Sequence, residues 1–391
     1  MAPAALEPAD AATAAALLAD CAAGGRPLVV RGGGTKLAWT TAAPPPETVL
    51  STKLLSHPIQ HFAGDLVATL PAGVTLAEAN AALARERQWL PLDPPHAGRA
   101  TIGGIVAAND SGPRRQQYGA PRDLIIGVEV ALADGRVARA GGRVVKNVAG
   151  YDLSRLLCGS FGALGVITSA TFKLVPLPAA STTLVVAPRD VAHAQELAAA
   201  IAAAPLTPTA LEIALFPPRL LVRFETTAQA AARQSSIARQ IAERGGAAAE
   251  RLEGGPEAQA WRDHDARVWD GGGTIVKISV LPTEVAATVG ELSAASSSGR
   301  VAAAAVGRIA LGVLYARLEG EPAEQAAVIA ALRRRAAASG QGSVVVLDAP
   351  AALRALVPAW EIDPGVFSVM RAVKQRFDPH GILAGFAAAG F

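Results

Sequence analysis

Residues Pro91 to Pro178 read PLDPPHAGRATIGGIVAANDSGPRRQQYGAPRDLIIGVEVALADGRVARAGGRVVKNVAGYDLSRLLCGSFGALGVITSATFKLVPLP. Glycine turns and isolated polar residues interrupt short apolar runs throughout this stretch, and the glycine clusters stand beside strand and helix signals. Several loops can therefore converge on one extended ligand. The composition is typical of a pocket for phosphate groups and a flat ring system.

Two glycine clusters are candidates for a phosphate site. Arg31-Gly-Gly-Gly-Thr-Lys36 follows an apolar strand signal, and successive N–H groups in such a curl point at an anion, to which Lys36 could add charge. Thr101-Ile-Gly-Gly104 precedes the helix-like IVAAND, so its N–H groups would lie at a positive helix end. A triple glycine alone is more often a flexible turn, but a pyrophosphate between both loops would be bound by backbone donors from each.

A third cluster, Gly159-Ser-Phe-Gly162-Ala-Leu-Gly165, has the spacing G-x-x-G-x-x-G. This spacing differs from the G-x-G-x-x-G of a Rossmann dinucleotide site, and the chain also lacks the G-x-x-x-x-G-K-[ST] phosphate loop. Two interpretations stay open. The glycines allow either a tight entry into a strand or a close approach of the backbone to a flat ring.

The chain divides into two regions that differ in their pattern of predicted helices and strands. The first 178 residues alternate short strands and helices; the predicted elements are a helix at 10–23, strands at 27–31 and 66–70, a capping-box helix at 75–87, a hairpin at 124–132 and 136–140, and a strand at 166–174. Residues 181–348 contain two β-α-β-β-α units, which predict an antiparallel sheet with helices on one face. The joint between these units, residues 252–273, is the least regular part, and a helix at 365–377 follows.

Composition limits the classes of function. A chain of 391 residues is expected to form two domains, and a net charge of +3 gives no reason to expect nucleic-acid binding. Cys21 and Cys158 are too few and too far apart for an iron–sulfur cluster or a structural zinc site, so no metal site is predicted and redox chemistry would need an organic cofactor. The acidic N-terminal segment and the lack of a long uncharged apolar run favour a cytoplasmic location.

At these motifs the chain resembles the FAD-binding domain of the vanillyl-alcohol-oxidase and p-cresol-methylhydroxylase type. RGGGT, TIGGIVAAND, YGAPRDLIIGVEVALADG and GSFGALGVITSATFKLVPLP match in order, and MRAVKQRFDPHGIL matches the C-terminal return segment. Within that family, VVKNVAGYDLSRLLCGSFGALGVI resembles the FAD-binding subunits of bacterial glycolate oxidases, also called glycolate dehydrogenases. The resemblance implies an α+β fold with a two-part FAD-binding domain at 1–178, a cap at 179–355 built from the duplication, and a return segment at 356–391.

The resemblance also implies which residues contact the cofactor. The pyrophosphate loop would be Arg31, Gly32, Gly33, Gly34, Thr35 and Lys36. Further flavin contacts would come from Pro91, Thr101, Gly103, Gly104, Asn109, Ser111, Gly112, Tyr118, Asp123, Gly162, Gly165 and Ile167.

Two departures from the family pattern qualify this expectation. Members that bind FAD covalently often have histidine where Thr35 stands, so the FAD here is expected to be non-covalent. The usual ending after Asp-Pro is replaced by Gly381-Ile-Leu-Ala-Gly385, which leaves the contacts of the tail open.

Catalytic residues are harder to assign. Related 2-hydroxyacid dehydrogenases carry a His-x-His pair in the cap, and this chain has none. Of its histidines, only His264 falls near a predicted cap mouth, and a surface or structural role is favoured for it. Arg223, Lys277 and Arg308 interrupt apolar strand runs and could bind a substrate carboxylate, although a solvent-facing sheet explains them equally well.

By resemblance, the expected function is that of the FAD-binding subunit of a glycolate-oxidising complex that produces glyoxylate. Electrons would pass to an iron–sulfur subunit and then to quinone, and a homologous flavin subunit would belong to the same complex. Contact with the inner membrane would arise only through these partners. A self-sufficient FAD-dependent 2-hydroxyacid dehydrogenase and a non-catalytic flavin relay or assembly subunit are the alternatives.

Overall fold

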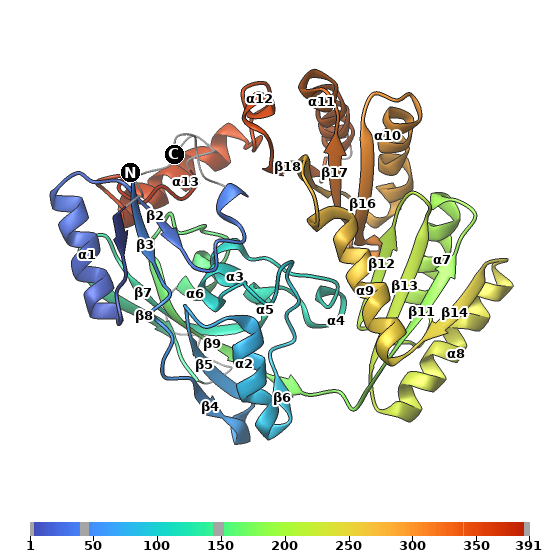
Figure 1. The fold of residues 1–391 in the computed structure, drawn as a ribbon, viewed down its shortest axis with the longest axis horizontal. Coiled ribbons are helices and arrows are strands. Elements are labelled where there is room, and N and C mark those ends of the chain that lie inside the picture. The colour runs from blue at the N-terminus through green and yellow to red at the C-terminus, as the bar shows by residue number, and fades with distance from the viewer. Residues whose placement is uncertain (1–3, 40–46, 144–151, 339, 387–391) are drawn as a thin grey trace. The chain divides into compact units, whose positions relative to one another are not determined.

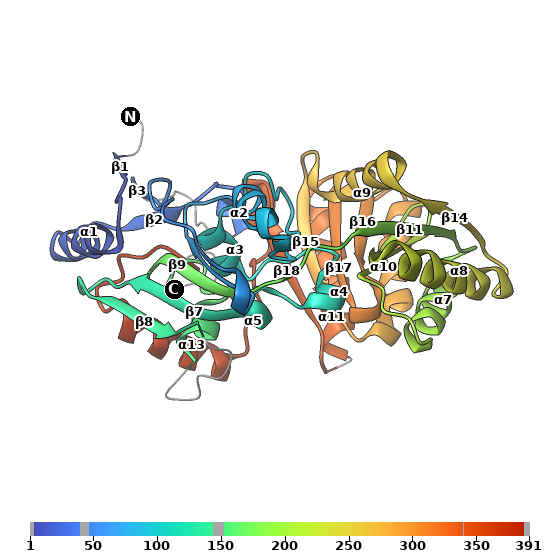
Figure 2. The ribbon, with the colours of Figure 1, turned by 90° about the horizontal axis from the view of Figure 1, so that it is seen from below.

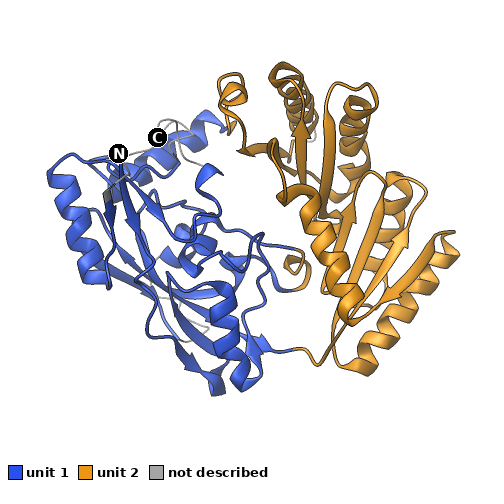
Figure 3. Cartoon of the chain, viewed as in Figure 1, with its two compact units in different colours: residues 1–112, 118–177, 362–391 blue, residues 113–117, 178–361 orange. Residues whose placement is uncertain are grey.

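The computed structural model describes residues 4–39, 47–143, 152–338 and 340–386 (Figure 1). Its contacts divide the chain into two compact units (Figure 3). Unit 1 comprises residues 1–112, 118–177 and 362–391, and unit 2 comprises residues 113–117 and 178–361. The expected domains at 1–178, 179–355 and 356–391 stay a prediction. The units differ from them by placing residues 113–117 in unit 2 and the second boundary after Glu361.

Unit 1 begins with a small parallel sheet that positions the first glycine cluster. Its order is β1 (Ala4–Leu6), β3 (Thr48–Ser51) and β2 (Leu28–Arg31). Helix α1 (Ala11–Ala23) is capped by Asp10, whose side chain accepts from the N–H of Thr13. The face of α1 with Leu18 packs in the same core as the sheet. The carboxyl ends of β2 and β3 therefore lie next to each other, with the glycine loop following β2.

The second sheet of unit 1 is antiparallel and has five strands. Its strands, in order, are β4 (Gln60–Phe62), β5 (Val67–Pro71), β9 (Val166–Lys173), β7 (Ile125–Ala131) and β8 (Val137–Gly141). The other α-helices and strands of unit 1 before residue 178 are α2 (Leu76–Leu83), β6 (Gln88–Trp89), α3 (Ile102–Ala108), α5 (Pro121–Leu124), α6 (Leu153–Leu157) and β10 (Val175–Pro176). Helices α2 and α3 share one apolar core with β5, β7 and β9, which anchors the second glycine cluster at the start of α3.

Unit 2 is built on an antiparallel sheet of eight strands. Its strands, in order, are β14 (Ala248–Leu252), β11 (Ala180–Ala187), β13 (Arg219–Thr226), β12 (Ala210–Ala214), β16 (Ala302–Arg308), β17 (Val313–Glu319), β15 (Thr274–Ser279) and β18 (Ser343–Asp348). Its main helices are α7 (Val191–Ala203), α8 (Ala228–Arg244), α9 (Gly254–Trp269), α10 (Val285–Ser297) and α11 (Pro322–Ala338), with the short α4 (Arg115–Tyr118) at its junction with unit 1 and α12 (Ala351–Arg354) near its end. The chain order of these elements repeats β-α-β-β-α, and the predicted α+β class is confirmed.

Two expectations about unit 2 are wrong. The joint at 252–273 is not irregular but forms α9, and α9 covers the sheet face opposite to α7, α8, α10 and α11 (Figure 2). The buried residues of α9, Glu257, Trp261, His264 and Val268, follow a helical period. Because half of them are polar, a search for apolar periodicity does not detect this helix.

Arg333, the first of three consecutive arginines near the end of α11, is buried. Its side chain is only 8% exposed, and its Nη2 donates to the carbonyl of Pro358 at 2.7 Å. Burial lowers the pKa of Arg333, an effect that the nearby Glu361 partly offsets. Arg333 therefore attaches α11 to the segment that ends unit 2.

The C-terminal segment returns to unit 1. Helix α13 (Pro364–Phe377) is followed by the buried Asp378, which accepts hydrogen bonds from the N–H groups of Ile382 and Leu383. The N–H of Leu28 donates to Ile382 at 2.8 Å, and that of Ala384 donates to Leu28 at 2.9 Å. The tail thereby pairs with β2, the strand that leads into the glycine loop. Across the described residues, no helix is both long and apolar enough to span a bilayer.

Candidate functional site

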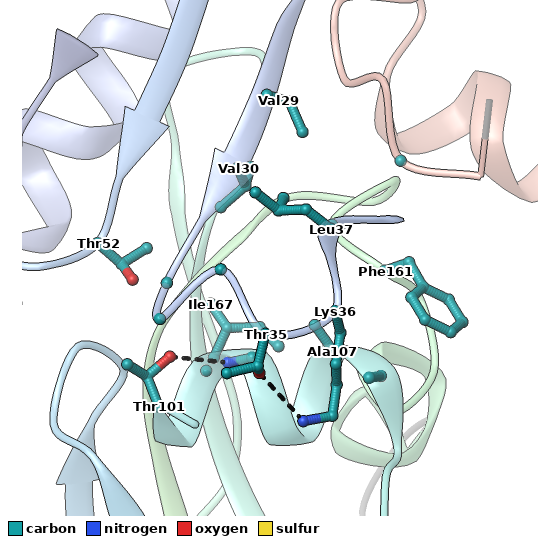
Figure 4. Close-up of a pocket in the computed structure, with 18 of the residues that line it drawn as sticks. Val29, Val30, Thr35, Lys36, Leu37, Thr52, Thr101, Ala107, Phe161 and Ile167 are labelled. Carbon is teal, nitrogen blue, oxygen red and sulfur yellow. Dashed lines mark hydrogen bonds between the residues drawn. The ribbon is translucent and has the colours of Figure 1, made fainter. Parts of the chain in front are cut away.

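A cavity of about 90 Å³ in unit 1 brings the predicted glycine clusters together (Figure 4). Predicted residues that line it are Gly32, Gly33, Gly34, Thr35, Lys36, Thr101, Gly103, Gly104, Gly162, Gly165 and Ile167. Lining residues that the sequence did not single out are Val29, Val30, Leu37, Thr52, Ala107, Ala108, Phe161, Ala384 and Gly385. The volume is well below the roughly 300–1,000 Å³ of pockets that enclose a whole drug-sized ligand. It therefore suits one part of a dinucleotide.

The first glycine loop packs closely against the segment before α3. A Cβ on Gly32 would lie 2.2 Å from Thr101 Oγ1, and one on Gly33 would lie 1.9 Å from the carbonyl oxygen of Arg99. Gly34 has φ +74°, in the left-handed region that favours glycine. Within the described part of the chain, the N–H groups of residues 32–35 have no hydrogen-bond acceptor. Such a row of free N–H groups is a nest for an anion.

Thr52 supplies a further donor that the glycine pattern does not reveal. It follows β3, is 4% exposed and lines the cavity, and its Oγ1 has no partner among the described residues. Figure 4 shows Thr35, Thr52 and Thr101 around the glycine loop. A buried hydroxyl without a partner costs free energy unless a ligand satisfies it. The parallel pairing of β2 and β3 is the signal that could have placed Thr52 here, since the ends of parallel neighbours meet at one edge.

Lys36 lines the cavity, but its charge is already balanced. Its Nζ lies 3.1 Å from Oδ2 of Asp110, and both side chains are buried. The same Nζ lies 3.2 Å from Thr35 Oγ1, to which it donates. Anion binding by this site therefore depends mainly on the backbone N–H groups and hydroxyls. These donors fit the pyrophosphate of FAD, which would lie against residues 32–35, Thr52 and Thr101.

The third glycine cluster has a structural explanation at Gly165 and contributes to the cavity at Gly162. A Cβ on Gly165 would lie 2.7 Å from Val130 Cγ2, so this glycine allows the tight entry into β9. Gly162 has φ +78° and faces Val30 across the cavity wall. Gly385 in the tail packs against the same turn, because its Cβ would lie 2.4 Å from the carbonyl oxygen of Phe161. The unusual tail sequence thus supplies part of the wall.

Seven predicted flavin contacts do not line this cavity, and several have structural contacts of their own. They are Arg31, Pro91, Asn109, Ser111, Gly112, Tyr118 and Asp123. Asn109 Oδ1 accepts from the N–H of Arg122, and Asp123 Oδ2 accepts from the N–H of Ala120. A Cβ on Gly112 would lie 1.8 Å from the carbonyl oxygen of Asp93. Their assignment to FAD stays a prediction, and residues 144–151 of the VVKNVAGYDL motif lie outside the described residues.

In unit 2, Arg308 and His264 meet at Glu212. Arg308 Nε lies 3.5 Å from Glu212 Oε1, and His264 Nε2 lies 3.2 Å from Glu212 Oε2. All three side chains are at most 5% exposed. Glu212 and Arg308 are direct neighbours on β12 and β16, and His264 reaches them from α9. This arrangement holds α9 on the sheet.

Arg223 belongs to a second buried cluster under α9. Its Nε lies 3.4 Å from Glu257 Oε1, and its guanidinium stacks on the Trp261 ring at 4.0 Å. Glu257 also accepts from the hydroxyls of Ser181 at 2.6 Å and Thr183 at 2.7 Å. Because Arg223 is paired with a buried carboxylate, it is not poised to bind a second one.

Lys277 is the remaining cationic candidate. It lies on β15 opposite Tyr315 of β17, is half-buried, and has no ion-pair partner among the described residues. The guanidinium of Arg308 lies 5.1 Å from the Tyr315 ring, so Tyr315 stands between these two cations. No group of three or more His, Cys, Asp or Glu side chains in the described ranges could hold a metal ion.

Comparison with known proteins places this site in context. Residues 2–141 match a family model described as "FAD binding domain". The chain is 38% identical over 206 residues to glycolate oxidase subunit GlcD of Bacillus subtilis, covering 53% of this chain and 44% of that protein. It is 41% identical over 159 residues to glycolate oxidase subunit GlcE of Escherichia coli, covering 40% and 45% respectively. A D-lactate dehydrogenase of Archaeoglobus fulgidus is 41% identical over 152 residues, covering 38% and 33%.

These matches leave part of each relative without a counterpart, because the chain spans less than half the length of these three curated relatives. The solved structure of an alkyldihydroxyacetonephosphate synthase has a TM-score of 0.73 at 16% identity and covers 97% of this chain and 76% of that one. At that identity the likeness concerns the fold alone.

Proposed function

We propose that this chain is the FAD-binding subunit of a glycolate-oxidising complex, with an FAD-binding domain of the p-cresol-methylhydroxylase type. Within the broader class of FAD-dependent 2-hydroxyacid oxidation, the substrate is glycolate and the product glyoxylate. Bound FAD supplies the acceptor for the hydride and the route for electrons out of the site. The FAD is held non-covalently.

The proposal is supported by the nest of N–H groups at residues 32–35 and the hydroxyl of Thr52 beside it, none of which has a hydrogen-bond partner among the described residues. These groups bind the pyrophosphate and fix the position of the cofactor in unit 1. Lys36 and Asp110 form a neutral pair next to it, which keeps the phosphate loop in place without adding net charge.

The proposal includes partners. Two relatives are named as subunits of glycolate oxidase, and the two cysteines of this chain are free thiols. Burial raises the pKa of the Cys158 thiol to about 12, which makes it a poor metal ligand or redox group. In this proposal electrons leave through an iron–sulfur partner subunit to quinone. A homologous flavin subunit belongs to the same complex, and the chain is held at the membrane only by these partners.

The pairing of Arg223 with Glu257 and of Arg308 with Glu212 supports dependence on partners for substrate oxidation. A substrate carboxylate would have to displace a buried one from either arginine, at a cost that reflects the loss of a desolvated ion pair. The homologous flavin subunit is therefore the principal substrate-binding chain.

The test is anaerobic visible absorbance of the isolated, FAD-loaded chain before and after glycolate. We expect the oxidised flavin band to persist in the isolated chain and to bleach once the partner subunits are added. Bleaching of the isolated chain would contradict partner dependence. A chain that purifies without flavin and takes none up would contradict the whole proposal.

A self-sufficient 2-hydroxyacid dehydrogenase is the second candidate. Lys277 favours it, because this cation on the cap sheet is half-buried and not paired with a carboxylate among the described residues. Under this alternative the isolated chain bleaches with glycolate or D-lactate, and Lys277→Met raises KM for the hydroxyacid. A flavin relay without a substrate site of its own would instead accept electrons only from the reduced partner subunit.

A further inference from the structure

One side of the cavity in unit 1 is formed jointly by the C-terminal tail and by the turn before β9. Ala384 and Gly385 of the tail line the cavity. Phe161 and Gly162 of the turn line it as well, and Figure 4 shows the Phe161 ring at this side. The two segments touch, because the rings of Phe161 and Phe386 meet edge to face with centroids 4.9 Å apart. The position of the tail on the turn therefore decides the shape of this wall.

Lys374, on α13, links the tail to the turn. Its Nζ donates to the carbonyl oxygen of Leu383 in the tail at 2.7 Å and to that of Ala163 in the turn at 3.0 Å. The same atom donates to Oδ2 of Asp378 at 2.6 Å. An ammonium group has three N–H donors, so every donor of Lys374 has an acceptor. One side chain thus connects α13, the tail and the turn, all within unit 1.

Asp378 makes this link rigid. Its side chain is fully buried, and that of Lys374 is 13% exposed. Oδ1 of Asp378 accepts from the N–H of Ile382 at 3.1 Å, and Oδ2 accepts from the N–H of Leu383 at 2.8 Å. The carboxylate therefore closes the turn that leads from α13 into the tail. Removing one partner of such a buried pair is strongly unfavourable, because the other charge is left without compensation.

The link ends where the tail enters the cavity wall. Beyond Leu383 the lining residues Ala384 and Gly385 have little or no side chain to bury, so backbone contacts must place them. A Cβ on Gly385 would lie 2.5 Å from the amide nitrogen of Ala163, whose carbonyl oxygen accepts from Lys374. The lysine and the lining glycine thus meet the turn at the same residue.

We propose that Lys374 is a positioning residue for FAD: by holding the tail on Ala163 it completes the cavity wall at Ala384 and Gly385 and raises the affinity for the cofactor. The inference rests on the proposed placement of FAD in this cavity. It does not depend on glycolate being the substrate or on partner subunits. By linkage, the docked tail strengthens FAD binding by the same factor by which bound FAD strengthens docking of the tail.

The test is the dissociation constant of FAD, measured by titrating the deflavinated full chain with FAD and following flavin fluorescence. Lys374→Met keeps an unbranched apolar side chain but removes the ammonium group. We expect the dissociation constant to rise by roughly 5- to 150-fold, the usual range for coupling between sites. The double variant Lys374→Met with Asp378→Asn removes both charges and leaves no unpaired buried carboxylate. It should give a rise of similar size, because the link to Ala163 is missing in both variants.

Two control variants separate positioning from other effects. Arg376→Met removes an exposed cation from the same last turn of α13 and should leave the FAD dissociation constant unchanged. Asp10→Ala removes the N-cap of α1, and Asp10 does not line the cavity. It should lower the thermal stability of the chain and leave the FAD dissociation constant unchanged.

Hydrogen exchange measures docking of the tail directly. The N–H of Ala384 donates to the carbonyl oxygen of Leu28 at 2.9 Å, so its exchange reports whether the tail is in place. Mass spectrometry should show faster exchange of residues 379–386 in Lys374→Met, while α2 exchanges as in wild type. Added FAD should slow exchange of the same tail segment in the wild type more than it slows exchange of α2.

Equal FAD affinity in wild type, Lys374→Met and the double variant would overturn the proposal, as would an equal loss in Asp10→Ala. If Lys374→Met does not fold, the double variant decides the matter. If neither folds, the wild-type exchange decides it, because equal slowing of the tail and of α2 by FAD would overturn the proposal. A wild-type chain that binds no FAD would overturn both this inference and the proposed function. Tight FAD binding without glycolate oxidation in the presence of partners would contradict the proposed function alone.

Discussion

Thr52 shows at the scale of one residue how a site for a ligand differs from a site built for stability. Its hydroxyl is buried at the cavity without a partner among the described residues, so the folded chain gains nothing from it. Thr52→Val should leave the melting temperature of the flavin-free chain unchanged or raised, because an unsatisfied polar group is replaced by an apolar one of the same shape.

The same substitution should weaken FAD binding by about tenfold, the effect of one lost hydrogen bond at roughly 1.4 kcal/mol. Differential scanning fluorimetry of the flavin-free chain and an FAD titration measure the two effects. A loss of stability without a loss of affinity would show that the hydroxyl serves the fold.

Gly103 and Gly104 are neighbours, but Gly103 packs against the end of β5, whereas Gly104 faces the cavity. A Cβ on Gly103 would lie 2.8 Å from the Cβ of Ala72 at the end of β5, whereas one on Gly104 would approach only Thr101 Oγ1, at 3.3 Å, on the cavity side. Gly103→Val should therefore prevent correct packing of α3. Gly104→Ala should fold and purify with little or no flavin.

The two variants are compared by yield of soluble protein and by the ratio of flavin to protein absorbance. Full flavin occupancy in Gly104→Ala would contradict the placement of the pyrophosphate beside α3.

At the scale of elements, the sequence predicts helices and hairpins best where a capping or turn motif coincides with the expected apolar pattern. The capping box at Thr75 and Glu78 marks α2, and Asp134-Gly135 marks the hairpin of β7 and β8. The sequence also predicted that the glycine clusters lie close together, because each cluster is a local signal next to a predicted strand or helix. These features depend on a few adjacent residues and need no knowledge of distant contacts.

Other elements could not be predicted because their partners are distant in sequence. Helix α9 buries Glu257 and His264 against cations contributed by separate strands, so its pattern looks irregular until the sheet is assembled. Thr52 and Gly385 enter the cavity through strand pairing with β2 and through the return of the tail. The pairing of Arg223 and Arg308 with acidic side chains likewise follows from sheet order, which charge patterns alone do not give.

Strand β13 carries a pH-dependent contribution through Glu225. Burial raises the pKa of Glu225, but the hydrogen bonds and charge of Arg114 outweigh it and hold the pKa below its ordinary value of 4.5. A carboxyl group with a lowered pKa stabilises the fold at pH values above its ordinary pKa and loses this contribution as the pH falls through its folded pKa. The stability difference between wild type and Glu225→Gln should therefore be constant from neutral pH down to about 5 and shrink below that.

Urea unfolding of both proteins at a series of pH values measures this difference. The pair Arg239 and Glu243 provides the comparison, because Glu243→Gln alters an exposed contact and should show little difference at any pH. A difference that grows on acidification would contradict the lowered pKa.

At the scale of the whole molecule, each unit has its own apolar core, which predicts two cooperative transitions on heating. Calorimetry with and without FAD should show one transition that FAD shifts strongly, since ligand at 100 times its Kd adds about 2.7 kcal/mol to the state that binds it. The transition assigned to unit 1 should lose this shift in Gly104→Ala. A single transition under all conditions would show that the units unfold together.

The pairing of Leu28 with the tail also has a consequence for biosynthesis. Ala384 and Gly385 complete the cavity wall, yet the ribosome makes them only after all of unit 2. At about 5–20 residues per second, the interval between Leu177 and Gly385 is roughly 10–40 s. During that time the nascent chain carries its glycine loop without the last strand partner of β2. The cavity wall is therefore incomplete until Ala384 and Gly385 have been made, and flavin loading at a complete cavity follows the synthesis of unit 2.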